Sequence, residues 1–482
     1  MKTLLSLLSF TLISTSALAA LPSVGPDYVR PTAASSGPWR DTGDNVAWKA
    51  GAPADAFARG EWWKLFADPA LDALETRALV ANQDLRAAAA RVEEARAAAG
   101  EARSAYWPQV ALNPSVTREQ GSLTAPNGLP EPLATTYRAP LVASWEIDLF
   151  GRVRRLSESA RAEAEASAAT FESVRLALTA EVAANYFSLR ALDQETILIA
   201  DGVELRAHAL ELVTSRRKGG AATDFDVARA ETELALTQAD AAATANHRSA
   251  LQNALAVLVG EPAASFQLAA ATAPLGTIQP VVPAGLPSDL LERRPDVAAA
   301  ERALAAANAR IGVAKAAFFP AISLTGGAGY ASGDIDQLFK ADSRTWSIGP
   351  SLYLPIFQGG RNRANLARSR AAYDESVATF RQSVLVAFRE VQDALTGTRL
   401  LTAQSAAQDR AVEAARRAGA LAQKRYDAGF VNYFEVIDAQ RTVLSAERTS
   451  AQLAAQRLNN SVALIKALGG GWTATPTTVA AR

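Results

Sequence analysis

Apolar residues recur at helical spacing over two very long stretches of this chain. In the second stretch, from about residue 361 to 427, successive apolar positions lie 7, 4, 7, 4, 3 and 4 residues apart, which is the spacing of a coiled-coil seam. These positions are Leu366, Tyr373, Val377, Val384, Phe388, Val391 and Leu395. A helix of that length extends about 100 Å. It is too long for a globular core, so the pattern predicts a bundle or a tube.

Each long stretch is followed by a return helix. The first runs from about residue 152 to a pause at Gly202 and resumes to Gly219, and its return helix is expected from about residue 224 to 258. The second ends at Gly429, after which an acidic and apolar stretch begins the next helix. Gly220 and Gly429 therefore mark the predicted tips of two helical hairpins.

Other stretches alternate between apolar and polar or small residues with a period of two, which predicts strands. They cover residues 109–117, 138–149, 322–330 and 346–356. The pattern fits a half-buried sheet of a soluble protein as well as a membrane barrel. Aromatic residues near the ends of these runs favour the barrel, because their rings prefer the membrane interface. They are Tyr106, Trp107, Phe318, Phe319, Trp346 and Phe357.

The order of elements occurs twice, which indicates an internal duplication. Pro320 repeats Pro108 at an offset of 212 (320 − 108), and Gly429 repeats Gly220 at an offset of 209 (429 − 220). From the order of elements, we expect a signal peptide, an N-terminal segment, a first repeat, a Pro-rich linker, a second repeat and a tail. Their ranges are 1–19, 20–66, 67–261, 262–287, 288–469 and 470–482.

The signal peptide is indicated by Lys2, by the apolar run from Leu4 to Ile13, and by the small residues Ala17 and Ala19 at the cleavage site. This run is too short to cross a bilayer as a helix, and no later stretch offers about 18 uncharged apolar residues. The mature chain is therefore expected to be exported.

Composition excludes several classes of function. The 482 residues carry 49 basic and 49 acidic side chains, so nothing favours a nucleic-acid partner. Cysteine is absent, which excludes disulfides, thiolate metal sites and cysteine nucleophiles. Neither His208 nor His247 belongs to a catalytic or metal-binding pattern, and no phosphate-binding loop is found. We therefore expect no enzyme activity, no cofactor and no metal.

Four strands cannot close a membrane barrel, which needs about eight. Open strand edges are not tolerated in lipid, so the chain must oligomerise. Three copies would give about twelve strands and about twelve helical columns, both closed by one symmetry axis. The expected fold is an α+β membrane protein, a trimeric barrel continued by a helical tube of about 100 Å. Such a tube is a conduit.

Short motifs occur in a specific order over nearly the whole mature chain. They are Gly25-Pro26-Asp27-Tyr28 with Arg30-Pro31, Trp62-Trp63 with Phe66 and Asp68-Pro69, Leu354-Pro355-Ile356-Phe357 with Gly359-Gly360-Arg361, and Arg425-Tyr426 with Gly429. The chain resembles the TolC-like outer membrane factors, most closely the NodT/OprM-like branch that serves multidrug pumps of the resistance-nodulation-division class. The resemblance implies a homotrimer with a 12-stranded β-barrel in the outer membrane, a periplasmic α-helical barrel and an equatorial domain. That domain would be built from residues 20–66, the linker and the tail.

The resemblance also implies roles for residues at the tips. Asp226 and Tyr426 match positions that hold the periplasmic mouth shut, and Glu435 and Asp438 match acidic rings that constrict it. The simpler interpretation of the two acids is that they favour a helix N-terminus. The tips at Gly220 and Gly429 would dock an adaptor. Val431 stands where the family often has an arginine, which departs from the usual charge contact between helices.

The implied function is the outer membrane exit duct of a tripartite efflux pump, conducting drugs or other small toxic compounds passively. Its partners would be two further copies, a periplasmic adaptor, an inner-membrane pump and outer membrane lipid. A channel for type I protein secretion is the alternative, and a periplasmic adaptor is disfavoured by the duplicated strand pairs. Many relatives carry a lipidated N-terminal cysteine, which this chain lacks, so no lipid anchor is expected.

Overall fold

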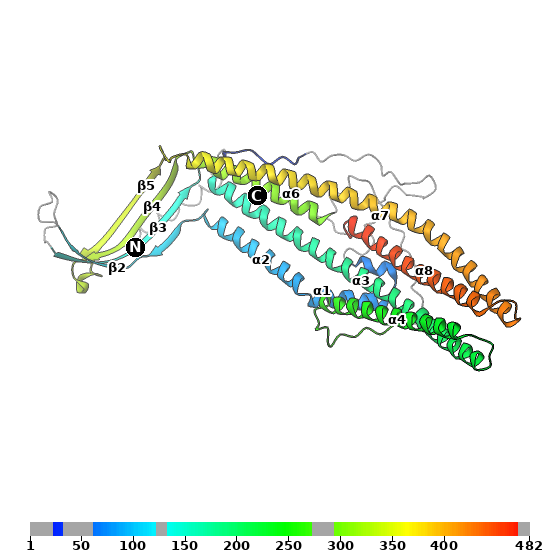
Figure 1. The fold of residues 1–482 in the computed structure, drawn as a ribbon. Helices are drawn as coiled ribbons and strands as arrows, with labels where there is room; N and C mark the ends of the chain where they lie inside the picture. The colour runs from blue at the N-terminus through cyan, green and yellow to red at the C-terminus, as the bar shows by residue number, and fades with distance from the viewer. Residues whose placement is uncertain (1–22, 32–60, 122–132, 272–293, 471–482) are drawn as a thin grey trace. The chain divides into compact units, whose positions relative to one another are not determined.

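The chain divides into two compact units, each built from three separate stretches of sequence. The computed structural model describes residues 23–31, 61–121, 133–271 and 294–470 (Figure 1). Of the described residues, unit 1 contains 23–31, 91–121, 133–168 and 299–380, and unit 2 contains 61–90, 169–271, 294–298 and 381–470. The predicted signal peptide and all but one residue of the predicted tail lie outside the described residues, as does much of the N-terminal segment and the linker.

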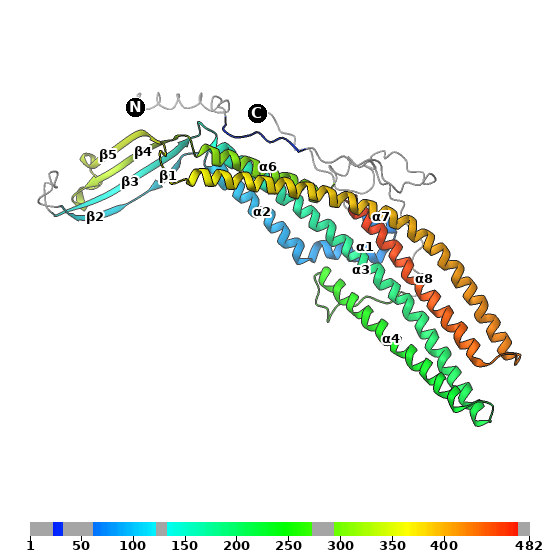
Figure 2. The ribbon, with the colours of Figure 1, turned by 45° about the horizontal axis from the view of Figure 1, so that its top comes forward.

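Unit 1 contains an antiparallel sheet with the strand order β1-β3-β4-β5, in which β2 also pairs with β3 (Figure 2). The first predicted strand is split at Pro114, because proline has no N–H to donate to a neighbouring strand. Both pieces pair with β3, so they act as one interrupted strand. The strands are β1 (Gln109–Leu112), β2 (Ser115–Gln120), β3 (Leu133–Ile147), β4 (Ala321–Ser332) and β5 (Arg344–Tyr353).

Strand register confirms the predicted alternation. Leu141, Ala328 and Trp346 lie side by side on the apolar face. Their sequence neighbours, Val142, Gly327 and Ser347, lie on the face with small and polar residues. A Cβ atom on Gly329 would lie 2.3 Å from the Ala139 carbonyl oxygen, so only glycine fits there.

Residues 23–31 pack against the start of α3 (Arg152–Lys218) and against α6 (Pro295–Ala316). Val24 donates its N–H to the Phe150 carbonyl at 2.9 Å, and Asp27 forms an ion pair with Arg155 at 2.6 Å. The Asn308 amide donates to the Pro26 carbonyl at 3.0 Å. Residues 23–31, predicted as part of an equatorial segment, therefore belong to unit 1.

Two helical hairpins extend through unit 2, α3 with α4 and α7 with α8 (Figures 1 and 2). Their bounds are α3 (Arg152–Lys218), α4 (Asp224–Leu258), α7 (Arg361–Asp427) and α8 (Tyr433–Ala467). The predicted pause at Gly202 is wrong, because α3 is continuous there. A Cβ on Gly202 would lie 3.2 Å from Leu444, so this glycine permits close packing of α8. Within the described stretches, no helix is both long and apolar enough to cross a bilayer.

The helical sequence pattern of residues 68–104 forms two helices, α1 (Pro69–Ala81) and α2 (Gln83–Ser104), with a break at Asn82. The backbone of Asn82 is extended, with ψ of 129°. Its side chain accepts the Leu85 N–H at 2.9 Å and donates to the Leu258 carbonyl at 3.0 Å. The first bond is a local helix cap and the second is a tertiary contact, and together they satisfy backbone groups at the start of α2 and the end of α4, which stabilises the break.

The largest hydrophobic core lies in unit 2, where η2 (Trp62–Phe66) and α1 pack against α3 and the ends of α4 and α8. Trp62 donates its indole N–H to Thr179 at 3.1 Å, and Tyr186 donates its hydroxyl to Asp68 at 2.6 Å. The core includes Trp62, Trp63, Phe66, Leu71, Leu74, Tyr186, Phe187, Leu189, Leu255, Phe266 and Leu458.

Candidate functional site: the two hairpin tips

Both hairpins turn through the same backbone motif. Gly220 and Gly429 have φ of +79° and +78°, a left-handed conformation that glycine adopts without strain. The N–H of the next residue, Ala221 or Phe430, donates to the carbonyl five residues back at 2.8 and 2.9 Å, respectively. This hydrogen-bonding pattern is a Schellman cap. The predicted hairpin tips are therefore confirmed, and they share the offset of 209 residues (429 − 220).

The first tip is held by polar contacts within its own hairpin. Thr223 caps α4 and exchanges hydrogen bonds with Asp226, whose carboxylate accepts the Thr223 N–H and hydroxyl at 2.8 Å each. These bonds, the backbone one first, lower the pKa of Asp226. Arg217 and Asp224 form an ion pair at 2.5 Å across the turn, and its hydrogen bond lowers the pKa of Asp224.

The second tip has aromatic residues where the first has charges. Tyr426 and Tyr433 occupy the positions of Arg217 and Asp224, 209 residues later. Their ring centroids lie 5.0 Å apart in an edge-to-face arrangement, and only 6% of Tyr426 is exposed. Burial, and then the proximity of Tyr426, raise the pKa of Tyr433. The two tips are alike in backbone and different in chemistry.

The structure does not join Asp226 and Tyr426 by a hydrogen bond. Asp226 is engaged by Thr223, and the buried Tyr426 hydroxyl has no partner among the residues that the structure describes. The rings of the second hairpin instead lie under arginines of the first. The Arg216 guanidinium is 4.7 Å from the Tyr426 ring centroid, and that of Arg229 is 4.0 Å from the Phe434 ring centroid.

The predicted acids Glu435 and Asp438 lie on the first turns of α8, with 51% and 76% of their side chains exposed. Glu435 accepts from Arg425 at 3.4 Å, a charge contact between α7 and α8. Val431 cannot supply the charge contact expected at its position, but Arg425, at the end of α7, forms an ion pair with Glu435 of α8. Asp438 lies 4.0 Å from Arg441.

Further from the tips, α8 forms two ion pairs with the first hairpin, and the sequence analysis did not predict them. Arg441 pairs with Glu233, and Arg448 pairs with Asp240 at 2.9 Å. The two acids on α4 are seven residues apart, and so are the two arginines on α8. This shared spacing is the feature of the sequence from which the ion pairs could have been predicted. A groove of about 330 Å³ runs along these residues. Burial of the neighbouring Arg206 lowers the pKa of its guanidinium.

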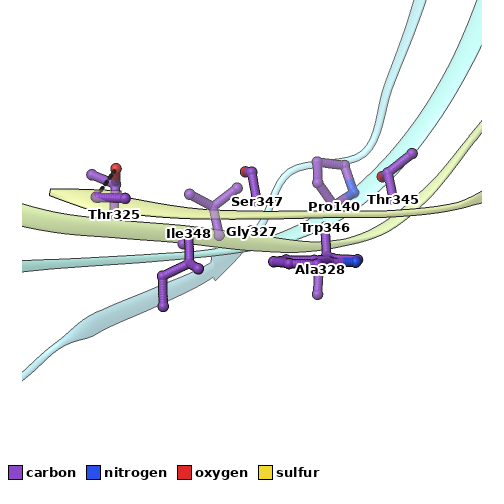
Figure 3. Close-up of a pocket in the computed structure, with 11 residues that line it drawn as sticks. Pro140, Thr325, Gly327, Ala328, Thr345, Trp346, Ser347 and Ile348 are labelled. Carbon is purple, nitrogen blue, oxygen red and sulfur yellow. Dashed lines mark hydrogen bonds between the residues drawn. The ribbon is translucent and has the colours of Figure 1, made fainter. Parts of the chain in front are cut away.

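A second hollow, of about 540 Å³, lies over β3, β4 and β5 of unit 1. Figure 3 shows Thr325, Thr345 and Ser347 pointing to one side of the sheet and Ile348 to the other. The residues that line the hollow on the polar side include glycines and short hydroxyl side chains, and none is charged. Such a surface offers no charged group that would bind one ligand tightly. No group of three His, Asp or Glu side chains in the described ranges could hold a metal ion.

Comparisons with known proteins cover both halves of the duplication. The model for the family described as outer membrane efflux protein matches residues 74–261 and 286–470. The solvent efflux pump outer membrane protein SrpC of Pseudomonas putida is 37% identical over 462 residues, covering 93% of this chain and 95% of that protein. The cation efflux system protein CusC of Escherichia coli is 34% identical over 453 residues, covering 93% and 96%. The structure of the Neisseria gonorrhoeae MtrE outer membrane channel in its open state aligns with a TM-score of 0.81 at 33% identity, covering 93% and 98%.

Proposed function

Because the chain belongs to the outer membrane efflux protein family, we propose that it is the outer membrane exit duct of a tripartite efflux pump. In this role it conducts its cargo passively from the periplasm to the exterior. The observation that carries the proposal is the combination, in one chain, of a sheet with one apolar face and two helical hairpins with matching tips. The apolar face faces lipid, and the face with small residues lines the pore.

Closure of the pore needs more than one copy. The sheet follows a path from β1 to β5 and does not return on itself. We propose a homotrimer in which three sheets form one barrel of about twelve strands. The helical hairpins of the three copies form the periplasmic tube. Residues 61–66 and 262–271, which lie in unit 2 beside the end of α4, contribute to its equatorial band.

The hairpin tips are proposed to serve two roles. Gly220 and Gly429 shape the ends that dock a periplasmic adaptor, which connects the duct to an inner-membrane pump. Phe430, next to Gly429, is 79% exposed, and Phe225, on the first turn of α4, is 69% exposed. Such exposed aromatic side chains favour a protein partner.

The same tips are proposed to gate the periplasmic mouth, with Asp226 and Tyr426 holding it shut. Asp226 fixes the shape of the first tip through its bonds to Thr223, and Tyr426 contacts the first hairpin through Arg216. Glu435 and Asp438 are proposed to form rings of negative charge around the symmetry axis, which favour cations and repel anions. Their exposure supports this role.

The cargo is proposed to be small toxic compounds, drugs or organic solvents among them. A relative is named for solvent efflux and another for cation efflux, so relatives of similar identity differ in cargo. The polar face is uncharged at the hollow over β3, β4 and β5, which is compatible with that breadth, because it makes no ion pair with the cargo there.

Two measurements test the proposal. Purified trimers in planar bilayers should conduct poorly at rest and form a wide pore when Tyr426→Ala opens the mouth. A host deprived of its own exit duct should regain resistance to drugs or solvents when it expresses this chain with its adaptor and pump. Monomeric protein, or a full set of partners that restores no export, would contradict the proposal.

A further inference from the structure

The two hairpins meet at their tips through arginine side chains stacked on aromatic rings. Arg216 of α3 lies over Tyr426 of α7, and Arg229 of α4 lies over Phe434 of α8, at 4.7 and 4.0 Å from the ring centroids. The Phe225 ring of the first hairpin lies 6.4 Å from the Phe434 ring. Each arginine belongs to one hairpin and each ring beneath it to the other, so both stacks join the two hairpins.

The polar groups near these stacks do not form the link. Asp226 accepts both of its short hydrogen bonds from Thr223, within its own turn. The Tyr426 hydroxyl is buried and has no partner in the described part of the chain. Arg217, the neighbour of Arg216, is bound to Asp224 of its own hairpin. The contact between the hairpins therefore uses the face of the Tyr426 ring, and the Tyr426 hydroxyl forms no hydrogen bond with the described residues.

The Tyr426 ring offers a buried face to an exposed cation. Only 6% of Tyr426 is exposed, whereas Arg216 is exposed, and the negative face of the ring attracts its guanidinium. Tyr433 packs against the Tyr426 ring edge-to-face and fixes its orientation. A planar guanidinium can stack on a ring, which a lysine ammonium cannot do.

We propose that the closed periplasmic mouth is held by two arginine–aromatic stacks, Arg216 on Tyr426 and Arg229 on Phe434. Tyr426 acts through its ring rather than through its hydroxyl, and the two arginines are positioning residues for the gate. This inference rests on the proposed function as an exit duct. It assigns a role to two arginines and separates the contribution of the Tyr426 ring from that of its hydroxyl.

The test compares single-channel records of purified trimers in planar bilayers. Tyr426→Phe keeps the ring and removes the hydroxyl, so it should stay closed like the unchanged protein. Tyr426→Ala, and the double variant Arg216→Gln with Arg229→Gln, should raise the open probability by about fivefold or more. Arg217→Gln is the matched control, because it removes an adjacent arginine whose partner lies in the same hairpin. It should stay closed.

Two results would overturn the inference. One is Tyr426→Phe opening the pore as much as Tyr426→Ala, which would place the link at the hydroxyl. The other is the double arginine variant behaving like Arg217→Gln. Helix content and trimer mobility identify variants that fail to fold, and Arg216→Lys, which keeps the charge but loses the flat guanidinium, should open the pore partially in a folded trimer.

Failure of this inference is distinguishable from failure of the proposed function. If the unchanged chain restores export in cells while the arginine variants match their control, the stacks are refuted and the duct stands. If the unchanged chain restores no export with its adaptor and pump, the duct itself is refuted.

Discussion

Arg441 of α8 forms an ion pair with Glu233 of α4, 208 residues earlier in the chain. Arg448 repeats the contact with Asp240 at the same separation of 208 residues. Since each step is seven residues on both helices, the two return helices lie side by side in register. Arg448 also donates to Glu195 of α3 at 2.8 Å. The second hairpin is thus attached to the first by charges at regular intervals.

Removing Arg448 should loosen α8. Arg448→Met leaves the Glu195 carboxylate, whose side chain is only 4% exposed, without its cation. An unpaired buried charge costs about 3–5 kcal/mol. We expect faster hydrogen exchange along α8 and a lower unfolding temperature. Arg417→Met is the control, because its pair with Glu413 is exposed on both sides and contributes about 0–1 kcal/mol. Equal effects of the two variants would contradict the prediction.

The acids of α8 should control cation block. Glu435→Ala combined with Asp438→Ala should weaken block by polyvalent cations about fivefold or more, because it removes negative charge from the mouth. Arg425→Ala should strengthen block, since it frees Glu435 from its ion pair. Conductance titrations with a trivalent cation measure both effects. Asp409→Ala with Glu413→Ala removes two exposed acids of α7 as the control, and a response equal to the α8 pair would remove the acidic-ring assignment.

The tip glycine should resist substitution for a backbone reason. The added Cβ of Gly429→Ala would meet no atom within 4 Å. The φ of +78° would nevertheless cost about 1–2 kcal/mol, because a residue with a Cβ is strained in the left-handed conformation. Thermal unfolding and adaptor binding should both weaken. Gly100→Ala is the matched control, because Gly100 lies within α2 and also meets nothing within 4 Å. That substitution should stabilise the protein by about 0.5–1 kcal/mol. If Gly429→Ala were equally stabilising, the left-handed turn would not matter.

Glu75 of α1 should make stability depend on pH. Its side chain is fully buried, both carboxyl oxygens lack partners among the described residues, and burial raises its pKa to about 9. The folded state therefore keeps a proton that the unfolded state has released between about pH 4.5 and 9. Stability is highest below this window and falls through it as pH rises, by at most about 1.4 kcal/mol per pH unit.

Glu75→Gln tests this dependence, because it has the same size and no proton to lose. Its unfolding temperature relative to the unchanged protein should rise steadily from pH 5 to 9. If the unfolding temperatures of the two proteins differed by the same amount at every pH, Glu75 would ionise normally. Glu94→Gln, an exposed glutamate of α2, should leave the pH dependence unchanged.

The sequence by itself determined the elements whose cause is local. The heptad spacing and Gly429 predict the bounds of α7 at residues 361 and 427, and the structure has the same bounds. The expected start of α4 at about residue 224 agrees with the structure, where Thr223 caps the helix and a capping box forms. Alternation with a period of two predicts the faces of β4 and β5. Glycine conformation, helix capping and strand alternation act over a few residues, so these elements can be read along the chain.

Tertiary structure alone decided the features that depend on distant residues. The break at Asn82 is stabilised by a hydrogen bond from its amide to the distant Leu258 carbonyl, and Gly202, inside the continuous α3, lies against Leu444 of α8. The partners of Tyr426 are likewise invisible in sequence, since Arg216 lies 210 residues earlier (426 − 216). Which arginine meets which ring depends on the register of the two hairpins, and that register is set by packing across the whole of unit 2 rather than by any local motif.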